Sequence, residues 1–397
     1  MKSIKQAFLL LLVFNLFSCA SRVPVREREE TIPPYGIEKA IQADYLTIIA
    51  AGDNLIHDPI LKASYKDGVY NFNSIYSRIK DYILPGDIAF INQETILGNK
   101  TLGYSGYPLF GSPQEAGSAI MDAGFTIVNH ANNHVMDKGE AGILSTIDFW
   151  DSLNSPNGKH YLGIYRSEDE RLNRRVIINA NNIKVGFLAY TFSTNGIPVP
   201  KDKPYLVSLT EPEKMAEEID ELRPLCDYLV VSMHWGEEYR QDINQTQEKL
   251  TTLLAEHSVD LVIGHHPHVL APLANITRPD GMNMTVFYSL GNFLSAHVRP
   301  SKEALLGALA YVRLKKTDGE TRAEKIGIIP TLTHYDAKMS SFSVYPLPEY
   351  TEELAAKHWK RLNDPEMTQA RLYKMAQDLF GPALINYNPF FQNPSMR

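Results

Sequence analysis

The sequence predicts an α/β protein whose sheet is covered on both faces. Two observations support this: strand-like and helix-like patterns alternate along the chain, and most of the strand-like runs are almost entirely apolar. A third observation concerns function. Several of these runs end in Asp, Glu, Asn or His, and ligands of open α/β sheets bind where the strands end at their carboxyl termini.

Taken in order, the predicted buried strands cover residues 45–51, 88–91, 125–128, 184–190, 228–233, 261–263 and 285–290, and two longer strands cover 308–314 and 325–332. Helices are predicted at about 74–84, 140–153 and 245–257. Another helix is expected to start at a Ser112–Glu115 capping box and end at Gly124, and Thr210 is expected to cap a helix that Pro224 stops. After residue 346 the pattern becomes helical, over 352–362 and 366–379, and an Asn- and Pro-rich tail follows.

Composition limits the classes of partner. The chain has 397 residues and a formal net charge of −7, so nothing indicates nucleic-acid binding. An acidic polymer would have to be held by local cations or by a metal, because the overall field of the protein repels it.

The N-terminus is predicted to be a targeting segment, residues 1–19. Lys2 and Lys5 precede an apolar stretch that is too short to cross a bilayer, and the stretch ends at Cys19 in a sequence similar to a lipoprotein lipobox. We expect a lipid anchor at Cys19. The alternative is a secretory signal cleaved elsewhere. Residues 20–44 are charged and contain prolines, which predicts a flexible tether. Cys226 then remains as a buried structural thiol.

The strand ends carry candidate metal ligands. They are Asp53, Glu94, Asn133 beside His134, His234, and the pair His266 and His268. Imidazole nitrogen, amide oxygen and carboxylate oxygen suit zinc, manganese or iron. Each of these groups alone could instead be an ordinary polar turn. His57 could be a ligand or the surface end of a short helix, one of the three histidines at 265–268 is expected to be structural, and Asp137 is expected to orient His134.

Six motifs in order resemble the poly-gamma-glutamate capsule synthesis (CapA) family: Gly52-Asp53, Asn92-Gln93-Glu94, Asn132-Asn133-His134 with Asp137 and Gly139, His234-Trp235-Gly236-Glu237-Glu238-Tyr239, Gly264-His265-His266-Pro267-His268-Val269 and Ser289-Leu290-Gly291-Asn292-Phe293. That family is similar to calcineurin-like metallophosphoesterases. The resemblance implies a four-layer αββα sandwich at residues 45–340, followed by a helical extension at 341–397. It also implies two divalent metals held by Asp53, Glu94, Asn133, His234, His266 and His268, with His134 as the imidazole that acts on the reacting group.

Two departures from the metallophosphoesterase pattern stand out. The first motif of that superfamily has a histidine two residues after the aspartate, whereas Leu55 stands at that position here, which leaves His57 as a substitute. The second motif supplies an aspartate, whereas this chain supplies Glu94. These departures predict that one of the two metal positions is weak or empty. The sequence therefore leaves the chemistry open.

Two functions remain. The first is a metal-dependent hydrolase or transferase at the cell surface, acting on a phosphoester or on an amide of an anionic envelope polymer. The second is a non-catalytic accessory lipoprotein of capsule assembly, in which the same residues bind polymer or a structural metal. Both predict a membrane-anchored protein of the cell envelope that works with a capsule polymer and with other capsule synthesis proteins.

Overall fold

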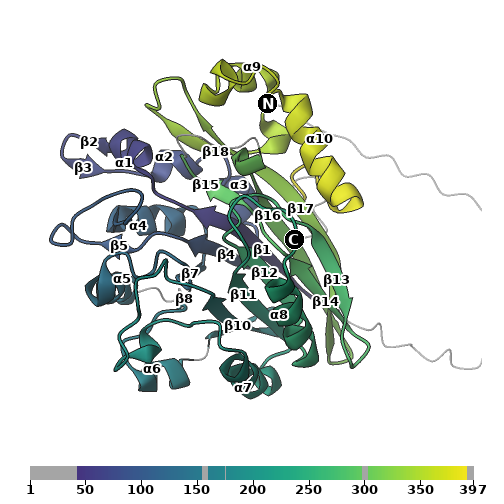
Figure 1. Ribbon diagram of the computed structural model, residues 1–397. Coiled ribbons are helices and arrows are strands. Elements are labelled where there is room, and N and C mark those ends of the chain that lie inside the picture. Colours follow the sequence, from purple (N-terminus) through teal and green to yellow (C-terminus); the bar gives the residue numbers. More distant parts are fainter. Residues whose placement is uncertain (1–42, 154–159, 175, 297–302, 391–397) are drawn as a thin grey trace, which may run out of the picture. The chain divides into compact units, whose positions relative to one another are not determined.

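The computed structural model describes residues 43–153, 160–174, 176–296 and 303–390 (Figure 1). The predicted signal segment, Cys19, residues 20–42 of the predicted tether, and the tail at 391–397 lie outside the described residues. Within the described part, no helix has the length and apolar character needed to cross a membrane.

Two large sheets form the centre of the fold. The first sheet has the order β18-β17-β16-β1-β4-β7-β8, with β15 also pairing with β1. Its strands are β1 (Asp44–Asn54), β4 (Ile88–Gln93), β7 (Ile127–Asn129), β8 (His160–Leu162), β15 (Asn292–Leu294), β16 (Leu306–Thr317), β17 (Glu320–Tyr335) and β18 (Phe342–Pro346). The second sheet has the order β13-β14-β12-β11-β10-β9. Its strands are β9 (Val176–Ala180), β10 (Ile183–Thr191), β11 (Tyr228–His234), β12 (Leu261–His265), β13 (Leu273–Thr277) and β14 (Asn283–Phe287).

Helices and short strands complete the fold. The helices are α1 (Asp58–Ser64), α2 (Asn73–Tyr76), α3 (Lys80–Ile83), α4 (Gln114–Asp122), α5 (Gly139–Ser152), α6 (Glu168–Asn173), α7 (Pro212–Leu222), α8 (Gln245–Glu256), α9 (Glu352–Lys357) and α10 (Gln369–Phe380). Two pairs of short strands lie outside the large sheets, β2 (Tyr65–Lys66) with β3 (Val69–Tyr70) and β5 (Leu97–Gly98) with β6 (Ser112–Pro113).

Alternate residues of the strands define four layers, because successive side chains of a strand point to opposite faces. On β1, Ile48 and Ala50 belong to the core between the two sheets, whereas Ile49 and Ala51 belong to the core beneath α1 to α5. On β11, Val230 faces the first sheet and its neighbours pack against α7 and α8. The order is helices, sheet, sheet, helices, so the predicted αββα fold is confirmed (Figure 1).

Parallel pairing brings the functional strand ends together. β1, β4 and β7 run parallel in the first sheet, and β10, β11 and β12 run parallel in the second. In the second sheet His234 pairs with His265, the last residues of β11 and β12. The carboxyl ends of strands from both sheets therefore lie at one edge of the sandwich.

The sheet continues past residue 340, where the helical extension was predicted to begin. β18 pairs with β17 from Thr331↔Pro346 to Tyr335↔Phe342. The helices α9 and α10 follow it, and Figure 1 shows them beside β17 and β18. Their buried residues Ala355, Leu372 and Phe380 join the same core as the inner face of the sheets, as expected for an extension that packs on the domain.

Three local predictions about helices were wrong. The helix at 74–84 is divided into α2 and α3, because the Ser77 hydroxyl donates to the Ser74 carbonyl at 2.9 Å and competes with the helical backbone. The capping box fails because Ser112 is in β6 and its hydroxyl lies 2.6 Å from that of Thr95. Glu211, not Thr210, is the N-cap of α7, since Pro212 begins that helix.

Candidate metal centre

Two glycines let the backbone approach closely at the strand ends. A Cβ on Gly52 would lie 2.0 Å from the carbonyl oxygen of Gly291, and one on Gly264 would lie 2.1 Å from that of Tyr288. Any side chain at either position would push the strand ends apart. Asp53 follows Gly52 directly, and His265 and His266 follow Gly264. The sequence therefore places candidate metal ligands next to positions that only glycine can occupy.

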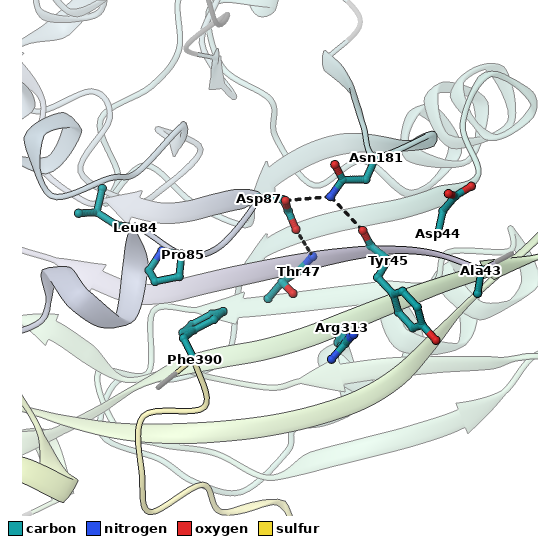
Figure 2. A pocket seen from close by; sticks show the side chains of 10 residues that line it. All are labelled: Ala43, Asp44, Tyr45, Thr47, Leu84, Pro85, Asp87, Asn181, Arg313 and Phe390. Carbon is teal, nitrogen blue, oxygen red and sulfur yellow. Dashed lines mark hydrogen bonds between the residues drawn. The ribbon is translucent and has the colours of Figure 1, made fainter. Parts of the chain in front are cut away.

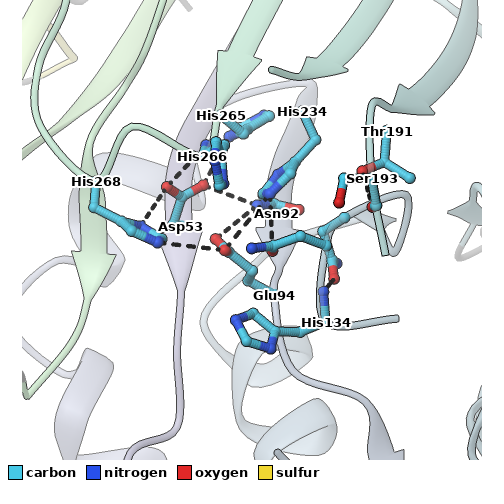
Figure 3. A network of polar contacts seen from close by, with 12 residues as sticks. Asp53, Asn92, Glu94, His134, Thr191, Ser193, His234, His265, His266 and His268 are labelled. Carbon is cyan, nitrogen blue, oxygen red and sulfur yellow. Dashed lines mark hydrogen bonds and ion pairs between the residues drawn. The ribbon is translucent and has the colours of Figure 1, made fainter. Parts of the chain in front are cut away.

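Asp53 is fully buried at the end of β1, and its carboxylate is contacted from two segments, β4 and residues 265–268. Its Oδ1 accepts a hydrogen bond from the Asn92 side chain at 2.8 Å. Its Oδ2 accepts from the His266 backbone N–H at 3.3 Å and lies 3.1 Å from His268 Nδ1 (Figure 3). His265 Nδ1 lies 3.3 Å from Oδ1. Burial raises the pKa of Asp53, but the contacts with His265 and His268 outweigh this and hold the pKa well below its usual value.

Glu94 follows β4 and lies at the centre of the site. Its Oε1 is 3.5 Å from His268 Nε2 and 3.6 Å from His234 Nε2, distances that are long for hydrogen bonds. The Asn92 amide reaches its Oε2 at 3.3 Å. Burial, and next the charge of Asp53, raise the pKa of Glu94 well above its usual value. Two carboxylates are thus held close together in a buried region.

The donor set fits a divalent metal. Two groups of side chains have ligand atoms within 4.8 Å of one another, Glu94 with His266 and His268, and Asp53 with Glu94 and His234. Glu94 belongs to both. Its Oε1, His234 Nδ1 and His266 Nδ1 are buried without a hydrogen-bond partner in the described structure, which is unusual for buried polar atoms. The arrangement is compatible with one metal or with two that share Glu94.

Two imidazoles of the cluster, those of His234 and His266, are held in the neutral form that a metal needs. Burial lowers the pKa of His234 well below its usual value, and the neighbouring His266 lowers it further. Burial likewise lowers the pKa of His266 to about 3. Neutral imidazole keeps a lone pair for coordination. His266 also has a backbone φ of +98°, which a bulky residue rarely adopts and which often marks a functional site.

Asn133 and His234 are in direct contact. The Asn133 Oδ1 lies 3.0 Å from His234 Nε2, and its Nδ2 is buried without a hydrogen-bond partner in the described structure. Asn133 follows β7 in the first sheet, whereas His234 ends β11 in the second. The contact therefore closes the site across the two sheets.

His134 and Asp137 form a buried pair next to this cluster. The His134 Nδ1 lies 2.8 Å from Asp137 Oδ2, and the same oxygen accepts the Phe110 backbone N–H at 2.7 Å. Asp137 can thereby fix the ring orientation of His134, as predicted from their spacing. The Phe110 ring meets the His134 ring edge-to-face with centroids 4.7 Å apart.

His57 lies beside the cluster but outside both ligand groups. It is the N-cap residue of α1, and its Nδ1 accepts the backbone N–H of Ala296 at 3.2 Å. That contact occupies one ring nitrogen, so ligation through Nδ1 would require the loop at Ala296 to move. The assignment of His57 as a ligand stays a prediction.

A cavity of about 260 Å³ opens beside the cluster. The residues that line it are Leu55, His57, Tyr107, Phe110, His134, Glu238, Tyr239 and His268. The sequence analysis assigned no role to Tyr107, Phe110, Glu238 or Tyr239, and it did not assign Asn92 as the bridge between Asp53 and Glu94. Asn92, Glu238 and Tyr239 stand in motifs that carry the family resemblance, and these motifs could have indicated them as site residues. Tyr107 and Phe110 belong to a loop with no local functional signal.

A larger cavity, about 770 Å³, lies elsewhere and is not a metal centre. It is lined by residues from the amino ends of the strands, including Thr47 and Asp87. Both oxygens of Asp87 are engaged, one by the Thr47 backbone N–H at 2.7 Å and the other by the Asn181 amide at 2.9 Å (Figure 2). Its carboxylate therefore acts as a local structural group.

Solved structures with a similar arrangement include the NAD nucleotidase NadN of Haemophilus influenzae, with 14% identity and a TM-score of 0.46 over 85% of this chain and 68% of that one. Another is the calcineurin-like phosphoesterase YfkN of Bacillus subtilis, with 16% identity and a TM-score of 0.42 over 73% of this chain and 91% of that one. At these scores we draw no functional argument from them.

Sequence relatives are more informative. The PGA biosynthesis protein CapA of Bacillus subtilis is 32% identical over 183 residues, which cover 46% of this chain and 45% of that protein. The capsule biosynthesis protein CapA of Bacillus anthracis is 32% identical over 186 residues, covering 46% and 43%. Each match thus spans less than half of the relative. The sequence model of the family described as bacterial capsule synthesis protein PGA_cap matches residues 47–297, more than half of this chain, and the chain belongs to that family.

Proposed function

We propose that this protein is a cell-surface lipoprotein that uses a divalent-metal centre in the synthesis or export of a capsule polymer, such as poly-gamma-glutamate. The observation that carries the proposal is the pair of ligand groups that share Glu94 at the joint edge of the two sheets. Family membership supports the process, and the buried acceptor atoms without partners support the metal. The metal is zinc, manganese or iron, and we propose two ions.

The residues divide into two roles. Asp53, Glu94, Asn133, His234, His266 and His268 would hold the metal, and neutral imidazoles beside two buried carboxylates suit a dication. A bound pair of such ions polarises a scissile group and supplies hydroxide near neutral pH. His134 faces the cavity with its Nδ1 on Asp137, which leaves Nε2 to move a proton to or from a substrate there.

The anchoring of the protein is a separate part of the proposal. Cys19 would carry the lipid and hold the domain at the membrane, with residues 20–44 as tether and the cleft exposed to the cell envelope. The expected partners are an anionic capsule polymer and other capsule synthesis proteins. Replacing Cys19 by Ala should move the protein from the membrane fraction to the soluble fraction. A Cys19→Ala protein that still sediments with membranes after a high-salt wash would show that another segment anchors it.

Complementation of a deletion strain distinguishes catalysis from an accessory role. Wild type, His134→Ala and His266→Ala are expressed to equal levels, and the capsule polymer is quantified and sized. His134→Ala should retain metal and fold but lose about 10²–10⁴ in rate, the usual share of a positioned acid–base group. We expect neither variant to restore polymer. Rescue by His134→Ala alone would favour a binding or structural metal. Rescue by both variants would mean that the metal cluster has no part in the function.

A further inference from the structure

Two groups of aromatic side chains, linked by the loop from Tyr104 to Tyr107, lie between β2–β3 and the cavity beside the candidate metal centre. In the first group Tyr65 and Tyr70 pair across β2 and β3, with ring centroids 4.8 Å apart. Tyr70 meets Tyr104 edge-to-face at 5.3 Å. Three residues further along the chain, the ring centroids of Tyr107 and Phe110 are 6.3 Å apart. The Phe110 ring in turn contacts the ring of His134. We call Tyr65, Tyr70, Tyr104 and Tyr107 the tyrosine track.

The track includes unusually exposed rings. The exposed fraction is 51% for Tyr65 and 72% for Tyr107, and Tyr239, which lines the same cavity, is 44% exposed. A cross-strand pair explains Tyr65 and Tyr70 structurally. It does not explain Tyr107, whose ring contributes little to the core. Contiguous exposed aromatic surface next to a cavity indicates a ligand-binding surface.

The loop that carries Tyr104 and Tyr107 is fastened at several points. The Gly106 N–H donates to Asp58 Oδ1 at 2.8 Å, and Lys138 Nζ donates to the Ser105 hydroxyl at 2.8 Å. Ser105 and Gly111 exchange backbone hydrogen bonds of 3.0 and 2.9 Å. The rings are thus held in place before any ligand arrives, which reduces the entropy lost on binding.

The same loop is coupled to His134. The Phe110 N–H and His134 Nδ1 share Asp137 Oδ2. α1 connects the two ends of the track, because His57 at its N-cap lines the cavity and Tyr65 at its C-cap begins β2. The seven residues of α1 span about 10 Å, so an extended strand of several units could lie along the track and enter the cavity.

The charges at the cavity favour an uncharged strand. Among the described residues that line it there is no Lys or Arg, whereas Glu238 is present. An anionic polymer would therefore be held here by the ions of the proposed metal centre alone, because this lining offers it one carboxylate and no guanidinium or ammonium group. A carboxylate accepts hydrogen bonds from hydroxyl groups, and tyrosine faces stack on the flat C–H faces of sugar rings. The two features together match a carbohydrate.

We propose that the tyrosine track binds an uncharged polysaccharide strand and leads it to the cavity, as a second ligand besides the capsule polymer. This inference goes beyond the proposed function and relies on it only in treating the cavity as part of the working site. The proposal concerns binding. It assigns no reaction to the strand.

Isothermal titration of the full chain with linear hexasaccharides tests the proposal. The probes are hexamers of N-acetylglucosamine and of glucose, and a γ-linked glutamate hexamer is the anionic comparison. We expect at least one sugar hexamer to bind, and Tyr107→Ala to weaken it about three- to tenfold. Tyr107→Phe keeps the ring and should bind nearly as wild type. Leu225→Ala, which removes an exposed apolar side chain far from the track in sequence, is the matched control.

Metal content is measured on every variant and should not change. Loss of sugar binding at the tyrosine track can therefore be distinguished from loss of metal at the proposed centre. The proposal is overturned if neither sugar hexamer binds, or if Tyr107→Ala binds them as wild type does. Stronger binding of the glutamate hexamer with the same dependence on Tyr107 would also overturn it. If Tyr107→Ala instead loses a protein that co-purifies with the wild type and sugar binding is absent, the track is a protein-docking surface.

Discussion

Asp260 and the pair Asp53 with Glu94 are buried carboxylates in opposite circumstances. Asp260, just before β12, is 6% exposed and is paired with two arginines, Arg223 and Arg278, and with the Leu229 backbone N–H at 2.7 Å. Asp53 and Glu94 are 0% exposed and no arginine or lysine is paired with them in the described structure. Their side-chain neighbours are asparagine and histidine.

The difference shows what each group is for. Fixed guanidinium groups neutralise Asp260 and satisfy its oxygens, so that cluster is complete as a structural feature. At the strand ends the charge is left without a protein cation, and Glu94 Oε1 has no hydrogen-bond partner. A buried negative charge of this kind is expected to be balanced by a cation from outside the chain. Burial of a carboxylate does not by itself distinguish a structural group from a candidate metal ligand. The residues paired with the carboxylate do.

The largest expected effect comes from making the same chemical change in both places. Asp260→Asn leaves Arg223 and Arg278 without their carboxylate and should destabilise the fold by about 3–5 kcal/mol. Glu94→Gln, measured in chelator, removes a buried acid that no arginine or lysine of the described structure neutralises and should leave the free energy of unfolding unchanged or higher. Urea unfolding of both variants checks this. An equal loss in Glu94→Gln would mean that Glu94 is a structural group like Asp260.

Metal removal should separate the two clusters next. A ligand present at 100 times its dissociation constant stabilises the folded state by about 2.7 kcal/mol. Chelation should therefore lower the melting temperature of wild type and of Asp260→Asn by similar amounts, because Asp260 is not involved in binding. A chelator effect that disappears in Asp260→Asn would contradict the separation.

The ligand assignment is tested with His266→Ala combined with His268→Ala. Loss of two imidazoles should lower metal affinity by more than about 100-fold, beyond the 10–100-fold typical of residues that only orient ligands. Metal content after purification without chelator is the measurement. His257→Ala is the control, since His257 pairs with Asp220 between α8 and α7 and should keep its metal. Stoichiometric metal in the double variant would refute the assignment.

The smallest effect extends the comparison to a buried histidine whose nitrogens are both engaged within the chain. His358 Nε2 is 3.1 Å from the Thr333 carbonyl oxygen and Nδ1 accepts the Lys360 N–H at 2.9 Å. Burial lowers the pKa of His358 to about 4. The unfolded chain therefore binds this proton first as pH falls, and the stabilisation present above pH 6.5 is lost progressively between 6.5 and 4.

Between pH 7 and 5.5 this histidine should account for a loss of roughly 1 kcal/mol. The measurement is the pH dependence of urea unfolding for wild type and His358→Gln, both saturated with metal so that the histidines of the cluster remain ligated. His358→Gln should show the shallower dependence. Parallel curves would mean that His358 takes up its proton as readily in the folded protein as in the unfolded chain.

The residue types of the site could be read from the sequence because they stand at strand ends. Apolar runs that end in Asp53, His234 and His265 predict both the strand and the edge at which its last side chain lies. The layers were likewise predictable, since near-continuous apolar strands require cover on both faces. The first residues of the helices were harder to predict. Ser112 and Thr210 have the composition of caps, but Ser112 makes a contact with Thr95, a residue distant in sequence, and Pro212 shifts the start of α7.

By itself, then, the sequence determined an α/β fold covered on both faces with candidate metal-ligand side chains at one edge, because both follow from local periodicity and from the direction of the strands. Tertiary structure alone decided that Glu94 belongs to both ligand groups, that Asn92 connects it to Asp53, and that the Phe110 amide reaches Asp137. These contacts join segments as distant in sequence as Glu94 and His268. Their distances depend on how two sheets pack, and no local pattern of residues records that packing.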